Sequence, residues 1–227
     1  MNRLFFRFLR TGACILAAGL MMPAFADLHI TLDRRGSGEL PVQYRDAEHL
    51  RIGDEQSGTR YLTSGGRNYV LMASPNGDKQ FAMDMDEFLE RENTPAAREP
   101  DLDRLTARPA DREETIGGVT GQVYRVESGN DSWELVLTGD DTIRTLTEAV
   151  YNAEIRMARM SGQAMAAEPL AAELALAREL GAQGILRGRL YTVAALEEGE
   201  SLPDEHFRLG DDILVVRDWK EMQASYH

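Results

Sequence analysis

The sequence contains one cysteine, Cys14, which lies in the N-terminal segment. Without other thiols the rest of the chain cannot form disulfides, use a thiolate nucleophile or hold a metal through cysteine ligands. It must therefore be stabilised by a hydrophobic core. Residues 27–227 are enough for a single domain that buries about 70% of the surface exposed by its unfolded chain.

The apolar run from Thr11 to Met22 is shorter than the roughly 18 residues expected of a membrane-spanning helix. Three arginines precede it, and the small-x-small sequence Ala24-Phe25-Ala26 follows. This order is typical of a secretory signal peptide, the alternative being an uncleaved anchor. We expect residues 1–26 to be a signal peptide cleaved after Ala26, leaving a periplasmic protein that does not span the membrane.

Basic residues are fewer than acidic ones: the sequence has 25 basic and 38 acidic residues, and its formal net charge is −13. An excess of negative charge opposes binding to the phosphates of nucleic acid or to an anionic lipid surface. We expect no nucleic-acid partner, and we expect the acidity to favour solubility.

Motifs for catalysis and cofactor binding are absent from the sequence. No Gly-x-Ser-x-Gly elbow, phosphate-binding loop or His-Glu-x-x-His motif occurs, and Gly36-Ser37-Gly38 lacks the third glycine of a dinucleotide site. The histidines show no metal-ligand spacing; they are His29, His49, His206 and His227. We predict no catalytic residue, no metal, no cofactor and no enzymatic activity.

An alternating pattern of apolar and polar residues begins at Asp27, where Leu28, Ile30 and Leu32 share one face. Such alternation predicts half-buried strands, and turns rich in Gly and Asn separate one strand from the next. A strand over 115–126 contains Gly117-Gly118, which suggests a bulge or a close backbone approach. The other predicted strands cover 40–45, 50–52, 60–64, 69–74, 80–85, 132–138, 185–193 and 213–216.

Two later segments have helical periodicity instead. Apolar residues recur every three or four positions from Ile143 to Met160, and Asp140 or Asp141 can cap this helix. A second helix is predicted from Pro169, in its first turn, to Gly181, where it stops. The charged segment 92–114 contains three prolines and is predicted to be a surface loop or a poorly ordered insertion.

Together these elements predict one α+β domain over residues 27–227. Many antiparallel strands followed by two amphipathic helices form a curved open antiparallel sheet, a half-barrel, with the two helices packed on its concave face. Its interior is either filled by side chains or open to an apolar guest.

The segment Gln80–Asp86 places methionines on one side of a predicted strand and aspartates on the other. Burying each large apolar side chain contributes roughly 1.5–3 kcal/mol, which is enough to fix the register without any functional demand. We therefore interpret the segment first as a hairpin strand. A calcium site is disfavoured, since the glycine and downstream glutamate of a calcium loop are missing.

Methionine is adaptable enough to line a promiscuous cavity, although it also fills ordinary gaps in a core. Arg187 and Arg189 lie in one predicted strand of an acidic protein, so they are candidates to contact an anion or a partner; the alternative is pairing with internal carboxylates. The candidate apolar lining residues are Leu71, Phe81, Met83, Met85, Trp133, Leu135 and Met157.

Several segments carry a family resemblance: VQYRDAEHLRI, RYLTSGGRNYVLM, FAMDMDEF, ETIGGVTGQVYRV, a helix after ELVLTGDD, and EHFRLGDD. With the signal peptide, they resemble an uncharacterised family of exported bacterial proteins similar to the lipoprotein-carrier (LolA/LolB-like) half-barrels. The resemblance implies a periplasmic half-barrel whose concave side holds acyl chains or a protein segment. The carrier relatives begin with a helix before the first strand, which this sequence lacks.

Our leading hypothesis is a non-enzymatic periplasmic binding protein that holds an apolar or acyl-chain ligand between sheet and helices. The alternative is an envelope protein–protein interaction or sensor module with a solid core. A hydrolase is the least favoured class. The expected partners are a lipid, a lipoprotein or another envelope protein.

Overall fold

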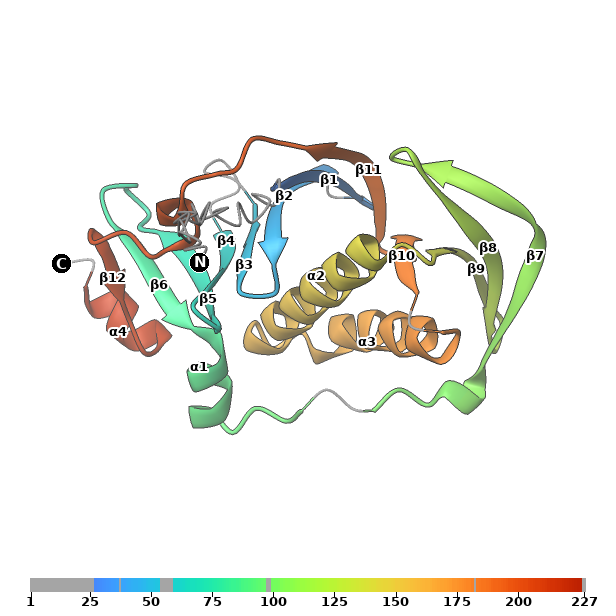
Figure 1. The fold of residues 1–227 in the computed structure, drawn as a ribbon. Coiled ribbons are helices and arrows are strands. Elements are labelled where there is room, and N and C mark those ends of the chain that lie inside the picture. Colours follow the sequence, from blue (N-terminus) through green and yellow to red (C-terminus); the bar gives the residue numbers. More distant parts are fainter. Residues whose placement is uncertain (1–26, 37, 54–58, 97–98, 182, 226–227) are drawn as a thin grey trace, which may run out of the picture.

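One sheet runs through most of the molecule, and two helices lie against its inner side (Figure 1). The structure, a computed structural model, describes residues 27–36, 38–53, 59–96, 99–181 and 183–225. The predicted signal peptide lies outside these residues.

The described chain contains twelve strands, and their bounds follow the alternating pattern over most of its length. They are β1 (Leu28–Arg34), β2 (Gly38–Asp46), β3 (His49–Ile52), β4 (Thr59–Ser64), β5 (Arg67–Ala73), β6 (Gln80–Asp84), β7 (Leu105–Ile116), β8 (Val119–Ser128), β9 (Asp131–Thr138), β10 (Gly184–Arg187), β11 (Tyr191–Glu198) and β12 (Ile213–Val215).

Two long and two short α-helices accompany these strands in the described residues, together with two 3₁₀ turns. The helices are α1 (Met85–Arg91), α2 (Asp141–Met160), α3 (Ala164–Glu179) and α4 (Trp219–Ala224). The 3₁₀ turns are η1 (Leu102–Arg104) and η2 (Asp204–Phe207).

The sheet is open and almost entirely antiparallel. Its strand order is β12-β6-β5-β4-β3-β2-β1-β11-β10-β9-β8-β7, and the two end strands do not pair with each other. Only the contact between β12 and β6 is parallel. The sheet curves around α2 and α3, as Figure 1 shows, and this confirms the predicted α+β fold with an open antiparallel sheet and helices.

The main core lies between the concave face of the sheet and the two long helices. Leu28, Ile30 and Leu32 of β1 are buried there, as their alternation predicts. Ile143, at the first turn of α2, reaches the same core, and the Asp140 carboxylate caps the helix by accepting a hydrogen bond from the Ile143 N–H at 3.0 Å. The apolar stripe of α2 thus explains both its helical form and its place in the fold.

A smaller cluster lies on the convex face of β4–β6. It contains Leu62, Tyr69, Leu71 and Ala82, and the C-terminal segment covers it with Leu209 and Ile213. Neighbouring residues of β5 therefore serve different faces, because side chains alternate along a strand.

The predicted loop at 92–114 is wrong in its second half. Residues 105–114 belong to β7, an edge strand of twelve residues. Pro109 is tolerated because an edge strand need not donate every backbone N–H, and the pairing register shifts between Pro109 and Glu113. The preceding segment crosses the open side of the helix pair (Figure 1), and Arg159 of α2 donates to its Thr94 and Pro95 carbonyls.

Other boundaries also differ from the sequence prediction. The strand predicted over 80–85 ends at Asp84, whose carboxylate accepts the N–H groups of Asp86 and Glu87 and so caps α1. The predicted strand 185–193 is two strands, β10 and β11, joined by a turn. Helix α3 begins five residues before Pro169, which therefore lies inside it rather than in its first turn.

The predicted strand 115–126 is divided by a hairpin turn into the end of β7 and most of β8. Gly117 and Gly118 separate β7 from β8 with φ values of 58° and 84°, which glycine adopts without strain. The two residues form the turn rather than a bulge, and a Cβ on Gly117 would lie 3.1 Å from Val193, so the close approach is also present.

An ion pair fixes the C-terminal segment to the start of the described chain. The Asp27 side chain is fully buried and accepts from Arg45 Nε at 2.8 Å and from the Leu202 N–H. Arg45 also pairs with Asp204 at 2.8 Å and lies over the Phe207 ring. Burial alone raises the pKa of Asp27, but the Arg45 and Leu202 hydrogen bonds hold that pKa below its ordinary value.

We predict that Arg45→Met lowers the free energy of unfolding by roughly 3 kcal/mol, because it leaves the buried Asp27 carboxylate without its charged partner. Urea denaturation near neutral pH measures this loss. Arg178→Met is the matched control, since it breaks the exposed pair with Glu148 and should cost less than about 1 kcal/mol. Equal losses in the two variants would contradict the assigned role of Arg45.

Candidate functional site: a methionine-lined cavity

A cavity of about 330 Å³ lies between the concave face of the sheet and the helices α2 and α3. We call it the methionine cavity. The sheet contributes residues of β1, β5 and β11, and the two helices contribute residues around the turn that joins them. Its lining comprises Arg34, Val70, Met72, Glu154, Met157, Ala158, Met160, Ser161, Gln163, Ala166, Leu170, Leu190, Tyr191 and Trp219.

Most of the wall is apolar and adaptable. Met72 enters from β5, and Met157 and Met160 enter from the last turns of α2. The unbranched methionine side chain changes shape at little cost, so these three residues can adjust to guests of different outline. The chain must turn between α2 and α3 at Ser161–Gln163, and this end of the helix pair leaves space above the sheet.

One side of the cavity carries a group of polar residues. Arg34 and Tyr191 are directly opposed in the β1–β11 ladder, and the Arg34 guanidinium lies 5.8 Å from the centre of the Tyr191 ring. Glu154 of α2 faces them, with its Oε2 atom 3.7 Å from Nη2 of Arg34. The Glu154 side chain is only 4% exposed, whereas that of Arg34 is 47% exposed.

The Tyr191 hydroxyl is buried and makes no well-formed hydrogen bond with any described residue. Burial and the neighbouring Glu154 carboxylate raise the pKa of Tyr191 well above its ordinary value, so the phenol keeps its proton. Burial also raises the pKa of Glu154, although the Tyr191 hydroxyl and the Arg34 charge oppose this rise. The polar side therefore offers one hydroxyl donor, one carboxylate and one partly exposed cation.

A second buried glutamate shows how a structural carboxylate is satisfied in this fold. Glu173 of α3 accepts the Arg189 N–H at 2.6 Å and the Tyr151 hydroxyl at 3.1 Å. Gly188 lets it approach, because a Cβ there would lie 2.3 Å from Glu173 Oε2. Glu173 thus holds the β10–β11 turn against α3. Glu154 is less well satisfied among the described residues: the Tyr191 hydroxyl lies beside it, and its ion-pair partner Arg34 is 3.7 Å away.

Of the lining residues predicted from the sequence, Met157 lies on the methionine cavity. The other predicted lining residues do not lie on this cavity. Phe81, Met83, Met85 and Leu135 are completely buried in the packed core. Their alternation and apolar character predicted burial correctly, but their neighbours in the core leave no room for a guest.

The two remaining predicted lining residues lie elsewhere. Leu71 belongs to the convex cluster, on the opposite face of β5 from Met72. Trp133 lines a different cavity, of about 270 Å³, beside Pro169 of α3. A strand pattern identifies apolar residues but does not show which face, or which end of the sheet, stays open.

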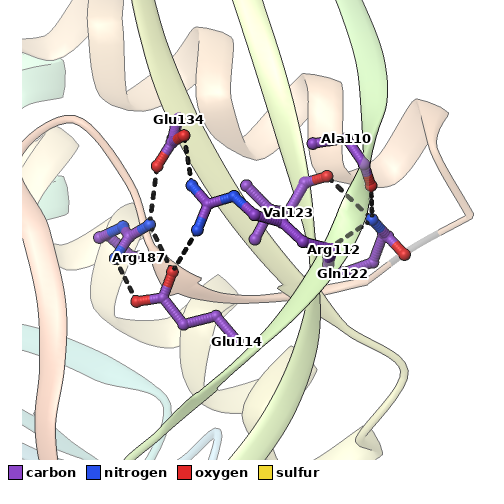
Figure 2. Close-up of polar contacts among 7 residues, drawn as sticks. All are labelled: Ala110, Arg112, Glu114, Gln122, Val123, Glu134 and Arg187. Atoms are coloured by element: carbon purple, nitrogen blue, oxygen red, sulfur yellow. Dashed lines mark hydrogen bonds and ion pairs between the residues drawn. The ribbon is translucent and has the colours of Figure 1, made fainter.

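Arg187 and Arg189 form ion pairs with carboxylates of the same protein. This was the alternative to contact with an outside anion or partner. Arg187 pairs with Glu114 of β7 and Glu134 of β9, and Arg112 shares both carboxylates (Figure 2). Arg189 pairs with Asp131. These contacts tie the outer strands to β10, and they occupy the arginine charge that an outside anion would need.

Figure 2 also shows why the irregular part of β7 is stable. The Gln122 amide nitrogen donates to the carbonyl groups of Ala110 and Arg112, at the place where the register shifts. The side chain thereby replaces ladder hydrogen bonds that the bulged strand cannot make. Gln122 has a structural role next to the arginine network.

Glu154, Tyr191 and Arg34 were not predicted from the sequence as site residues. A signal for Glu154 was present, because this glutamate lies four positions after Val150 and three before Met157, on the apolar stripe of α2. A carboxylate within such a stripe must be buried, which is costly without a partner. Nothing local marked Arg34 or Tyr191, whose importance follows from the pairing of β1 with β11.

We predict that Glu154→Gln becomes more stable relative to the unchanged protein as pH rises from about 4 to 7. The pKa of Glu154 is higher in the folded protein than in the unfolded chain, where it is about 4.5. Protonated Glu154 therefore stabilises the folded state below pH 4.5, and this stabilisation is lost as pH rises through the pKa of the folded state. The neutral amide does not titrate. Urea denaturation across this range measures the difference, with Glu148→Gln on the same helix as the control. A difference independent of pH would contradict the assignment.

No helix in the described chain is long and apolar enough to cross a membrane. The described residues also contain no cluster of three or more His, Cys, Asp or Glu side chains arranged to hold a metal ion. The sequence segment that predicts export, with Cys14, lies outside the part of the chain that the structure describes. Comparisons of the chain with protein-family models, curated proteins and solved structures found no match.

Proposed function

We propose that this protein is a non-enzymatic binding protein that holds an apolar guest in the methionine cavity. The cavity itself carries the proposal: its volume of about 330 Å³ falls within the range of roughly 300–1,000 Å³ typical of small-molecule sites. Its position between sheet and helices, and its wall of methionine and aliphatic side chains, suit an acyl chain or a similar apolar molecule.

The alternative function, an interaction or sensor module, differs from a binding protein in having a solid core. The cavity favours the binding protein over it. The charged loop predicted over 92–114, which could contact a partner in such a module, is also shorter than expected, since residues from 105 onwards are part of β7.

A larger cavity, of about 490 Å³, lies on the other side of α2 against β2–β5, but its chemistry differs. Asn68 accepts the Tyr61 hydroxyl at 2.5 Å and donates to Asp86 at 2.7 Å, and Arg156 donates to Asp86 at 2.9 Å. These polar groups satisfy one another at its wall. An apolar guest would gain less there than against the methionines, because it would displace water from polar side chains.

The place of action forms part of the same proposal. The N-terminal arginines, apolar run and small-x-small sequence support export to the periplasm. The open half-barrel with helices on its concave face is compatible with the resemblance to lipoprotein carriers. A lipid, a lipoprotein or another envelope protein is accordingly the kind of partner we propose.

We predict that Ala158→Phe weakens binding of the neutral apolar dye N-phenyl-1-naphthylamine by at least about tenfold, because the new ring fills the cavity. Fluorescence titration of the dye measures the affinity. Ala149→Phe is the matched control: it places the same ring on the same helix, but in the polar cavity. Unchanged dye affinity in Ala158→Phe, with a folded variant, would contradict the proposed site.

A further inference from the structure

We propose that the guest carries, at one end of its apolar chain, an uncharged head group that both donates and accepts hydrogen bonds, such as a hydroxyl. This inference rests on the proposed function of the methionine cavity and defines the chemical class of its guest. The observation behind it is the polar group of three residues, Arg34, Glu154 and Tyr191, on an otherwise mainly apolar wall.

The first requirement comes from Tyr191. Its side chain is 4% exposed, and its hydroxyl has no well-formed hydrogen bond among the described residues although it lies at the cavity. A buried hydroxyl without an acceptor costs free energy, and the other buried tyrosine of this region avoids that cost because Tyr151 donates to Glu173. The Glu154 carboxylate lies beside this hydroxyl but not in good hydrogen-bond geometry, so a guest oxygen would supply a better-placed acceptor.

The second requirement comes from Glu154. Its carboxylate lines the cavity, and its ion-pair contact with Arg34 at 3.7 Å is longer than a hydrogen bond. Ionised carboxylates accept several hydrogen bonds, as Glu173 does from Arg189 and Tyr151. A guest O–H or N–H would supply a donor to Glu154. Tyr191 and Glu154 together call for a group that accepts from one and donates to the other.

The charges at this end decide between an ionised and an uncharged head group. Arg34 and Glu154 compensate each other within the cavity wall. An anionic head group would place a second negative charge beside the buried carboxylate, and a cationic one would compete with Arg34 for Glu154. An uncharged group leaves the existing pair intact and avoids the desolvation cost of a further ion.

The test uses three ligands with the same alkyl chain: 1-decanol, decanoate and decylammonium, each displacing N-phenyl-1-naphthylamine at pH 7. We expect 1-decanol to bind most tightly, by about tenfold over either ion. Tyr191→Phe should reduce that preference about tenfold, and the dye affinity of each variant is measured first so that displacement can be converted to ligand affinity. Tyr151→Phe is the control, because it removes a buried hydroxyl that contacts Glu173 and does not line the cavity.

A second variant keeps the test informative if Tyr191→Phe folds poorly. Glu154→Gln removes the negative charge and should increase the affinity for decanoate relative to 1-decanol. Equal affinities for the three ligands, or tightest binding of an ion, with Tyr191→Phe without effect, would overturn the head-group inference and leave the apolar site standing. Failure of the dye and of all three ligands to bind would instead overturn the proposed function.

Discussion

Burial of the apolar stripes of α2 and α3 against the concave face of the sheet is the constraint on which the other features depend. Ile143 and Val150 of α2 and Leu174 of α3 share one core with buried residues of β1–β3 and β9–β11. The contact is close where α2 crosses β10: a Cβ on Gly184 would lie 2.7 Å from the Ile143 backbone, and Thr147 accepts the Ile185 N–H. A flat sheet could not surround two helices in this way, so curvature and helix packing support each other.

The same packing creates the cavity. Helix α2 is held tightly at its N-terminal end, whereas its last turns reach toward β5 and the start of β11 through Met157, Met160 and Glu154. The two buried glutamates show the contrast between the packed and the open parts. Glu173 is satisfied by a backbone N–H and a phenol, whereas Glu154 lies 3.7 Å from Arg34, beyond hydrogen-bond distance, and beside the Tyr191 hydroxyl, which makes no well-formed hydrogen bond. The head group proposed above would complete the hydrogen bonding of Glu154 and Tyr191.

Much of the fold could be predicted, because periodicity is a direct consequence of one-sided burial. The alternation of Leu28, Ile30 and Leu32 and the helical stripe from Ile143 to Met160 predicted the correct element types. The start of α1 could not be predicted in the same way. Phe81, Met83 and Met85 continue one alternating pattern across it, although Asp84 ends the strand by capping the helix. Strand β7 was missed because its charges and Pro109, which an exposed edge strand tolerates, are also typical of loops.

The candidate site was less predictable than the fold. Its lining comes from strands, helices and turns that are far apart in the sequence, so sheet curvature and helix placement decide which side chains meet. Met157 was predicted because it belongs to the apolar stripe of α2. Arg34 and Tyr191 approach only through the pairing of β1 with a strand formed more than 150 residues later, and no local pattern contains that information.

The methyl groups of methionine provide the most direct test of the account. With ¹³C-labelled methionine methyl groups, NMR spectra recorded during a titration with 1-decanol compare residues of one type in three environments. The account predicts shifts at Met72, Met157 and Met160, which line the cavity, and little change at the packed Met83 and Met85 or at Met165, which is 85% exposed. Shifts confined to Met165, or equal shifts at every methionine, would contradict a guest site between sheet and helices.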